Sequence, residues 1–224
     1  MPRLLFLTLL AVAAPLLAQP APSGGSSLAG SIEGKTYISP TGAFRITIPV
    51  LPELGGTIVD TDNVVTFQDD FSVLATVAAF PMDATQRWEF STRGKKDYLA
   101  YFFSNIVLPD FQQTFPGAKV ESARFASGIG DGALIVYLLL PGGSMFSQKL
   151  SFVTPGEQIP DAKRGNLLVV RNGWVFVLSI ELAERVLERS TYKKTTAEED
   201  DLLRQRLIDL LEKITFTKPA EPAS

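Results

Sequence analysis

Two nearly continuous apolar runs, separated by a two-residue turn, form the most informative pattern in the chain. Residues 165–181 read GNLLVVRNGWVFVLSIE, with LLVV before the turn and WVFVLSI after it. Asn172-Gly173 is typical of a type I′ β-hairpin turn, which needs positive φ at both central positions. A strand with one face in water alternates apolar and polar residues, and these runs do not. The pattern therefore predicts a core hairpin that is covered on both faces.

Further apolar segments predict the rest of a sheet. Residues 44–48 alternate with one polar face, and 64–68 and 71–80 form a second hairpin candidate. Ala75, Ala78 and Ala79 are small enough to leave room for a helix close to the second of these strands. Three more strands are expected at 118–125, 133–140 and 149–153, separated by glycine-rich breaks. The segment ALIVYLLL at 133–140 is apolar throughout, so it is expected to lie centrally in the sheet.

Helical spacing of apolar residues predicts two main helices. The first is expected at 92–107, ended by Pro109, with an irregular lead-in that contains Trp88 and a capping-box pattern at Asp83 and Gln86. A second capping box at Thr196 and Glu199 begins the other helix, expected at 197–214. Its apolar stripe consists of Leu203, Leu207, Leu210, Leu211 and Ile214. Residues 181–194 are expected to make a short helical turn.

The ends of the chain differ in composition from its middle. Residues 1–18 carry Arg3 and then an apolar core at 4–17, the pattern of a secretory signal, with cleavage expected after Ala18. Residues 19–34 are expected to be a flexible linker, 35–217 a single domain, and 218–224 a disordered tail. The protein is thus expected to be exported, periplasmic or secreted, with no stable membrane anchor once the signal is cleaved. An uncleaved anchor is the alternative.

Composition removes several classes of chemistry. The 224 residues include no Cys and no His, and the formal net charge is −3. Without His, the commonest general base and the Ser-His-Asp triad are absent, and without Cys there is no thiol chemistry. No basic stripe indicates nucleic acid as a partner. We therefore expect a non-enzymatic protein with no cofactor and no catalytic or metal-binding residues.

The order of elements resembles that of a known family. Tyr37 with a following turn, the strand GAFRITIP, a hairpin, a helix and a meander precede VVRNGWVFVLSI and a terminal amphipathic helix ending in ITF. This order is similar to that of the PsbP/Mog1-like family, including its bacterial exported members, over residues 37–216. The resemblance implies an α+β fold with an antiparallel β-sheet sandwiched between helices (α/β/α). Family members mostly act as assembly factors, extrinsic subunits or protein-binding modules, but no motif here transfers a binding site.

Two glycine motifs resemble nucleotide-binding loops and are interpreted otherwise. Gly30 to Thr36, GSIEGKT, is one spacer short of a phosphate-binding loop and lacks a strand before it, so it is assigned to the linker. Gly128, Gly130 and Gly132 precede a strand where a dinucleotide loop needs a helix. We interpret them as a tight turn between antiparallel strands.

Two sets of polar residues were weighed as sites. Oxygen ligands for Ca²⁺ are offered by loop residues, but their spacing is not that of an EF-hand, and we interpret them as turn formers; they are Asp60, Asp62, Asn63, Asp69 and Asp70. Ser190 and Lys193 have the spacing of a Ser–Lys pair. The polar surroundings of Lys193 favour a solvated, protonated amine that cannot act as a base.

An aromatic patch surrounds the first predicted helix, formed by Trp88, Tyr98, Tyr101, Phe102 and Phe103. Most of these rings are expected in the core, and some at the surface, where a partner can cover them. Three hypotheses follow. The first is an exported protein-binding or assembly module, the second a carrier of a small apolar ligand between helix and sheet, and the third a hydrolase using two carboxylates in one cleft.

Overall fold

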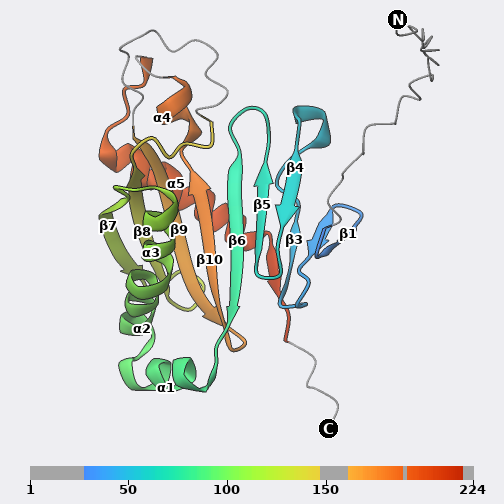
Figure 1. The fold of residues 1–224 in the computed structure, drawn as a ribbon, viewed down its shortest axis with the longest axis vertical. Coiled ribbons are helices and arrows are strands. Elements are labelled where there is room, and N and C mark those ends of the chain that lie inside the picture. The colour runs from blue at the N-terminus through green and yellow to red at the C-terminus, as the bar shows by residue number, and fades with distance from the viewer. Residues whose placement is uncertain (1–27, 147–160, 189–190, 219–224) are drawn as a thin grey trace, which may run out of the picture.

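The computed structural model describes residues 28–146, 161–188 and 191–218. In this part of the chain a seven-stranded antiparallel sheet has the order β4-β5-β6-β10-β9-β8-β7 (Figure 1). Its strands are β4 (Thr57–Asp60), β5 (Val64–Gln68), β6 (Leu74–Pro81), β7 (Lys119–Ala126), β8 (Ala133–Leu140), β9 (Ala162–Arg171) and β10 (Trp174–Glu181). The predicted hairpin is β9–β10, and β10 is the middle strand of the seven.

Helices lie on both faces of this sheet, which confirms the predicted α+β class. On one face lie α1 (Ala84–Arg93), α2 (Lys95–Phe102), a π-helical turn η2 (Phe103–Val107) and α3 (Leu108–Thr114). On the opposite face α5 (Thr196–Glu212) crosses β9 and β10, and the short helix α4 (Ala183–Leu187) follows β10 (Figure 1). Strands β8, β9 and β10 are buried along nearly their whole length, as their unbroken apolar runs predict.

A second sheet, which the sequence did not predict, covers part of the α5 face. Its order is β1 (Ser31–Glu33), β2 (Thr36–Ile38), β3 (Phe44–Thr47) and β11 (Ile214–Phe216). Tyr37 and Phe44 of this sheet pack edge-to-face on Phe67 and Phe176 of the large sheet, at ring-centroid distances of 5.9 and 6.1 Å. The two sheets and α5 therefore share one apolar core, as aromatic pairs of this geometry favour.

Several turns follow local rules. Asn172 and Gly173 have φ of 50° and 79°, which confirms the type I′ turn. The glycines at 128, 130 and 132 lie in the turn between β7 and β8, as interpreted from the sequence. The capping box at Asp83 is confirmed, and it begins α1.

The first helical region differs from the predicted helix at 92–107. Helical structure begins at Ala84, includes Trp88, and is interrupted at Gly94, whose φ is 76°. It also continues past Pro109. A proline inside a helix lacks the N–H and its ring displaces the carbonyl four residues earlier, and here the π-helical turn η2 directly before it absorbs that misfit.

Other boundaries also require correction. The capping box of α5 uses Thr195 and Glu198, one residue earlier than predicted, and the helix ends at Glu212 rather than at residue 214. Residues 31–33 of the predicted linker form β1, so GSIEGKT makes a β-hairpin. The predicted strand at 149–153, the signal at 1–18 and tail residues 219–224 lie outside the described residues.

Asp60 holds the start of the described chain against the large sheet. Its carboxylate accepts hydrogen bonds from the backbone N–H groups of Ala29 and Gly30, at 2.9 and 2.8 Å, and from the Tyr37 hydroxyl at 2.7 Å. Burial alone would raise the pKa of Asp60, but these hydrogen bonds outweigh it and hold the pKa below its ordinary value. The charged form is thus the one that the fold stabilises.

These hydrogen bonds to Asp60, which we call the Asp60 clasp, predict that the free energy of unfolding depends on pH. Because the folded-state pKa of Asp60 is depressed, its contribution is complete above the ordinary aspartate pKa of about 4 and is lost as pH falls through the folded-state value. We expect Asp60→Asn to lower the free energy of unfolding by about 1–2 kcal/mol at pH 7 and by progressively less below pH 4. Urea denaturation across pH measures this. Asp62→Asn, at an exposed neighbour, is the control, and an Asp60→Asn loss that does not change with pH would contradict the assignment.

Candidate functional site: a groove beside helix α3

A groove runs between α3 and the strands β5, β6 and β10. Two adjoining hollows form it, with volumes of about 400 and 250 Å³, and both are lined by Thr76, Asp110, Phe111 and Ser179. We call their union the α3 groove. The remaining lining residues of the larger hollow are Thr61, Asn63, Val64, Ala78, Phe80, Ile106, Val107 and Val177. Those of the smaller one are Thr66, Leu74, Thr114, Phe115, Met145 and Arg164.

The floor of the groove consists of short side chains in cross-strand rows. Val64, Ala78 and Val177 face each other across β5, β6 and β10 and form an apolar row. The next row is polar and runs Thr66, Thr76, Ser179 and then Asn166 of β9. Since strand residues two apart share a face, both rows belong to the surface beside α3. The floor thus changes from apolar to hydroxylated along the groove.

The polar row is anchored at its buried end. The Ser179 hydroxyl donates to the Asn166 side-chain carbonyl at 2.6 Å, and Asn166 donates weakly to the Val136 carbonyl at 3.4 Å. Thr66 and Thr76 hydroxyls lie 3.5 Å apart and are only half-buried. The hydroxyls at the open end therefore keep hydrogen-bonding capacity for an occupant.

Arg164 and Glu181 fix the helical wall in position. The Arg164 guanidinium donates through Nε and Nη2 to one Glu181 oxygen, at 3.3 and 3.1 Å, and lies 5.8 and 5.3 Å from the ring centroids of Phe111 and Phe115. Burial lowers the pKa of Arg164 while Glu181 opposes that shift, and an arginine remains protonated. Glu181 also accepts from Ser144 at 2.5 Å. The wall is thus a fixed surface, which favours a preformed binding site.

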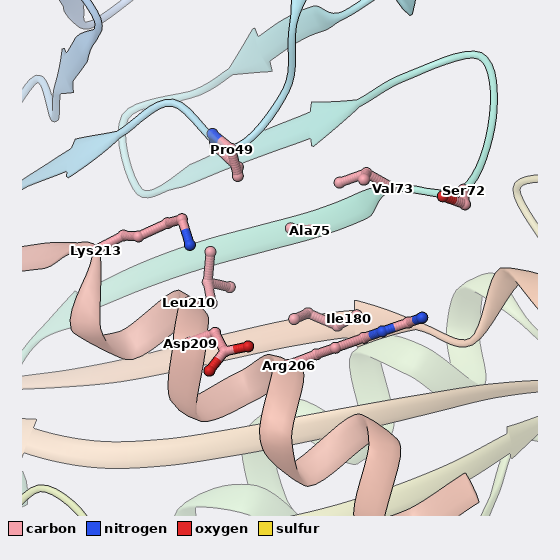
Figure 2. Close-up of a pocket in the computed structure, with 9 residues that line it drawn as sticks. All are labelled: Pro49, Ser72, Val73, Ala75, Ile180, Arg206, Asp209, Leu210 and Lys213. Atoms are coloured by element: carbon pink, nitrogen blue, oxygen red, sulfur yellow. The ribbon is translucent and has the colours of Figure 1, made fainter.

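Another hollow lies on the other face of the sheet, between α5, β6 and Pro49, which follows β3 (Figure 2). Its volume is about 260 Å³. Arg206 on its rim is paired with Glu184, and the Asp209 carboxylate accepts from Gln205 at 2.8 Å. Two of its three charged lining residues, all but Lys213, thus have partners within α4 and α5, and the hollow is smaller than the α3 groove, so it is the weaker candidate for a binding site.

The hypothesis of a hydrolase requires two carboxylates in one cleft. None of the described pockets is lined by two acidic residues. Acidic side chains do converge elsewhere. Glu121, Glu199 and Asp200 surround the ammonium of Lys163, at 2.5, 3.1 and 2.6 Å, and Lys163 is completely buried. Arg185 also pairs with Glu199 at 2.7 Å. Each of these carboxylates thus contacts a cation, which is the arrangement of a structural ion network.

The loop residues considered as calcium ligands are separated, and two of them are already engaged. Asp60 serves the clasp described above, and Asp69 accepts three backbone N–H bonds from residues 71–73, as a turn former does. Asp60 and Asp62 precede β5 whereas Asp69 and Asp70 follow it, so the strand holds the two pairs apart. Among the described residues, no group of three acidic side chains is placed to hold a metal ion.

The remaining candidates are the aromatic patch and the Ser–Lys pair, and the aromatic residues differ in exposure. Tyr98, Phe102 and Phe103 are buried against the sheet, whereas Trp88 and Tyr101 are exposed, as expected for an aromatic patch that surrounds a helix. Neither exposed ring lines the α3 groove. Lys193 is exposed, and Ser190 lies outside the described residues. In the described part of the chain, no helix is both long and apolar enough to cross a membrane.

No protein-family model fits the chain, and no curated protein matches it. Solved structures are similar in fold. Cyanobacterial PsbP (CyanoP) from Synechocystis sp. PCC 6803 has a TM-score of 0.48 and 13% identity, covering 87% of this chain and 96% of its own. The Ran-binding protein Mog1p from Saccharomyces cerevisiae has a TM-score of 0.45 and 10% identity, covering 83% and 96%.

A third similar structure comes from Bacteroides thetaiotaomicron, with a TM-score of 0.43 and 12% identity. The match covers 85% of this chain and 51% of that protein, so the chain spans about half its length. The predicted resemblance to the PsbP/Mog1-like family is confirmed for the fold, a large antiparallel sheet with helices packed against it. At this identity the likeness concerns the fold alone.

Proposed function

We propose that this protein is an exported, non-enzymatic binding module that holds a protein partner in the α3 groove. The observation that carries the proposal is the groove itself, an open, largely apolar surface between a fixed helical wall and a floor of short side chains. Exposed apolar surface of this kind is costly in water and marks interaction sites. The absence of His and Cys from the sequence, and the engagement of the converging carboxylates in ion pairs with Lys163, support a non-enzymatic role.

A second candidate function is the carriage of a small apolar ligand in the same groove. The larger hollow has a volume of about 400 Å³, and ligand pockets commonly measure about 300–1,000 Å³. It also lies between a helix and the sheet, where this function was expected from the sequence. Native mass spectrometry of freshly purified protein separates the two candidates, because a retained ligand adds a defined mass and an unliganded mass excludes it.

The partner proposal is tested by comparing variants of exposed apolar residues. Ile106 is exposed at the groove, and Trp88 is exposed on α1 away from it. We expect affinity purification from the source organism to enrich a protein with the wild-type chain, to lose it with Ile106→Asp, and to retain it with Trp88→Asp. Equal recovery with wild type and Ile106→Asp would overturn the proposal.

Export is proposed from the pattern of residues 1–18. A cleaved signal predicts that the protein recovered from the periplasm or the culture medium begins at Gln19. N-terminal peptide analysis of each cell fraction measures this. A chain that keeps its first 18 residues in the membrane fraction would support the anchor alternative instead.

A further inference from the structure

Among the described residues, helices cover only about half of the groove side of the large sheet. In Figure 1, α2 and α3 stand in front of β7, β8 and β9, whereas β4 and β5 have no helix in front of them. On the opposite face, α5 and the small sheet cover the same strands through a shared apolar core. As a consequence of this missing cover, Val59 of β4 is 62% exposed.

The part of the sheet that no described helix covers is about as wide as one helix. Neighbouring strands lie about 4.8 Å apart, so β4, β5 and β6 together present a surface about 14 Å wide. An α-helix with its side chains is about 10–12 Å in diameter, and packed helices lie about 8–10 Å apart. A single helix placed on these strands therefore reaches α3 and completes the layer. A small ligand in the groove would leave β4 and Val59 uncovered.

The floor and wall have the composition that such a helix needs. Ala78 and Thr76 are short, and Ala78 was noted in the sequence as leaving room for a helix close to its strand. Ala78 is buried in the core cluster that includes residues of α2 and η2, and it also lines the groove, so its short side chain keeps the floor low beside these helices. Along the wall, Ile106, Asp110 and Thr114 lie on successive helical turns and face the groove over about 12 Å. A wall of this length contacts about two turns of a partner helix, and a longer partner helix extends beyond α3.

The charge of the groove indicates the sign of the charge on its partner. Asp110 and Arg164 are the two charged lining residues, and Arg164 is neutralised by buried Glu181. Asp110 is exposed and makes no ion pair with any described residue, and Asp62 is exposed on the adjoining β4–β5 turn. The uncompensated charge at the rim is therefore negative, which favours a basic partner.

We infer that the α3 groove receives one amphipathic helix of a partner protein, with an apolar face directed at Val64 and Ile106 and basic residues directed at Asp110. This inference rests on the proposed function and specifies the partner's chemistry. The binding mode is that of a helix in a groove, in which apolar side chains at positions i, i+3, i+4 and i+7 contact the surface.

The test uses the mature chain and two fluorescent helical peptides of about 16 residues. Both carry leucines at i, i+3, i+4 and i+7, and their flanking charges are all lysine in one and all glutamate in the other. By fluorescence anisotropy at low salt, we expect the lysine peptide to bind at least about tenfold more tightly than the glutamate peptide. Asp110→Lys should remove or reverse this preference, and Ile106→Asp should weaken both peptides.

Glu212→Lys is the matched control, because it makes the same charge change at an exposed residue of α5 on the opposite face. An equal effect of Asp110→Lys and Glu212→Lys would overturn the inference, since it would indicate general charge attraction. Failure of both peptides to bind would also overturn it. The contrast between Ile106→Asp and Trp88→Asp in affinity purification still decides the proposed function in that case, because it does not depend on a helical partner.

Discussion

Lys163→Met is expected to lower the free energy of unfolding by about 3–5 kcal/mol. Lys163 is completely buried on β9, and its ammonium is the shared partner of Glu121 on β7 and of Glu199 and Asp200 on α5. Its removal leaves three carboxylates close together, with only Arg185 paired to Glu199. Breaking one side of a buried ion network costs far more than the network contributes as a whole, because the remaining charges are uncompensated.

Urea or thermal denaturation followed by circular dichroism measures this loss. Lys96→Met is the control, because Lys96 is exposed on α2 and makes no ion pair with a described residue. Its effect should be within about 0.5 kcal/mol of zero. A loss below about 1 kcal/mol for Lys163→Met would contradict the interpretation that this network joins α5 to β7 and β9.

Phe176→Ala is expected to cost about 3–5 kcal/mol as well, for a different reason. Phe176 lies on the middle strand β10 and is completely buried. Its ring contacts Phe44 of β3 and Phe216 of β11, with ring centroids 6.1 and 4.5 Å apart. Truncation opens a cavity where the two sheets meet, so both the apolar contact and the docking of the small sheet are weakened.

Denaturation measures the total loss, and hydrogen exchange locates it. We expect amides of β3 and β11 to exchange faster in Phe176→Ala, with smaller changes in β8. Phe71→Ala is the matched control, since the Phe71 side chain is 59% exposed and should change stability by about 0.5 kcal/mol or less. Uniform exchange changes across both sheets would contradict the role of Phe176 as the junction between them.

Most of the large sheet could be predicted from the sequence because its signals are local, although the edge strand β4 was not predicted. The Asn172-Gly173 turn demands positive φ, and the unbroken apolar runs of β8, β9 and β10 demand cover on both faces. The residues that give each of these signals lie within a few positions of one another in the sequence. The same holds for the capping box at Asp83, which is present as predicted, although it begins α1 at Ala84 where an irregular lead-in was expected.

The small sheet could not be predicted, because its pairing joins the two ends of the domain. Ile214 of β11 lies opposite Ile46 of β3, and residues 31–33 pair with 36–38 inside a segment whose composition is that of a linker. The ion network was missed for the same reason. In the sequence Lys163 belongs to an ordinary charged segment, DAKR, and only the packing of α5 against β9 brings Glu199 and Asp200 to it.

The α3 groove was only partly foreseeable. The short side chain of Ala78 indicates space for a helix beside β6, but the sequence predicts that helical structure ends at Pro109, so it does not predict α3 as a wall. The π-helical turn η2 carries the chain past that proline and presents Ile106 and Val107 to the groove. Such turns occur often at functional sites. A proline with helical spacing on both sides of it is the signal that would have indicated this wall.

Site-specific photocrosslinking in the source organism tests most directly whether the α3 groove binds a protein. A photoreactive phenylalanine analogue replaces Ile106 in the groove or, as the control, Trp88 on α1. We predict a discrete protein adduct of higher mass from position 106 after irradiation, and none from position 88. No adduct at position 106, or the same adducts from both positions, would contradict a binding site in this groove.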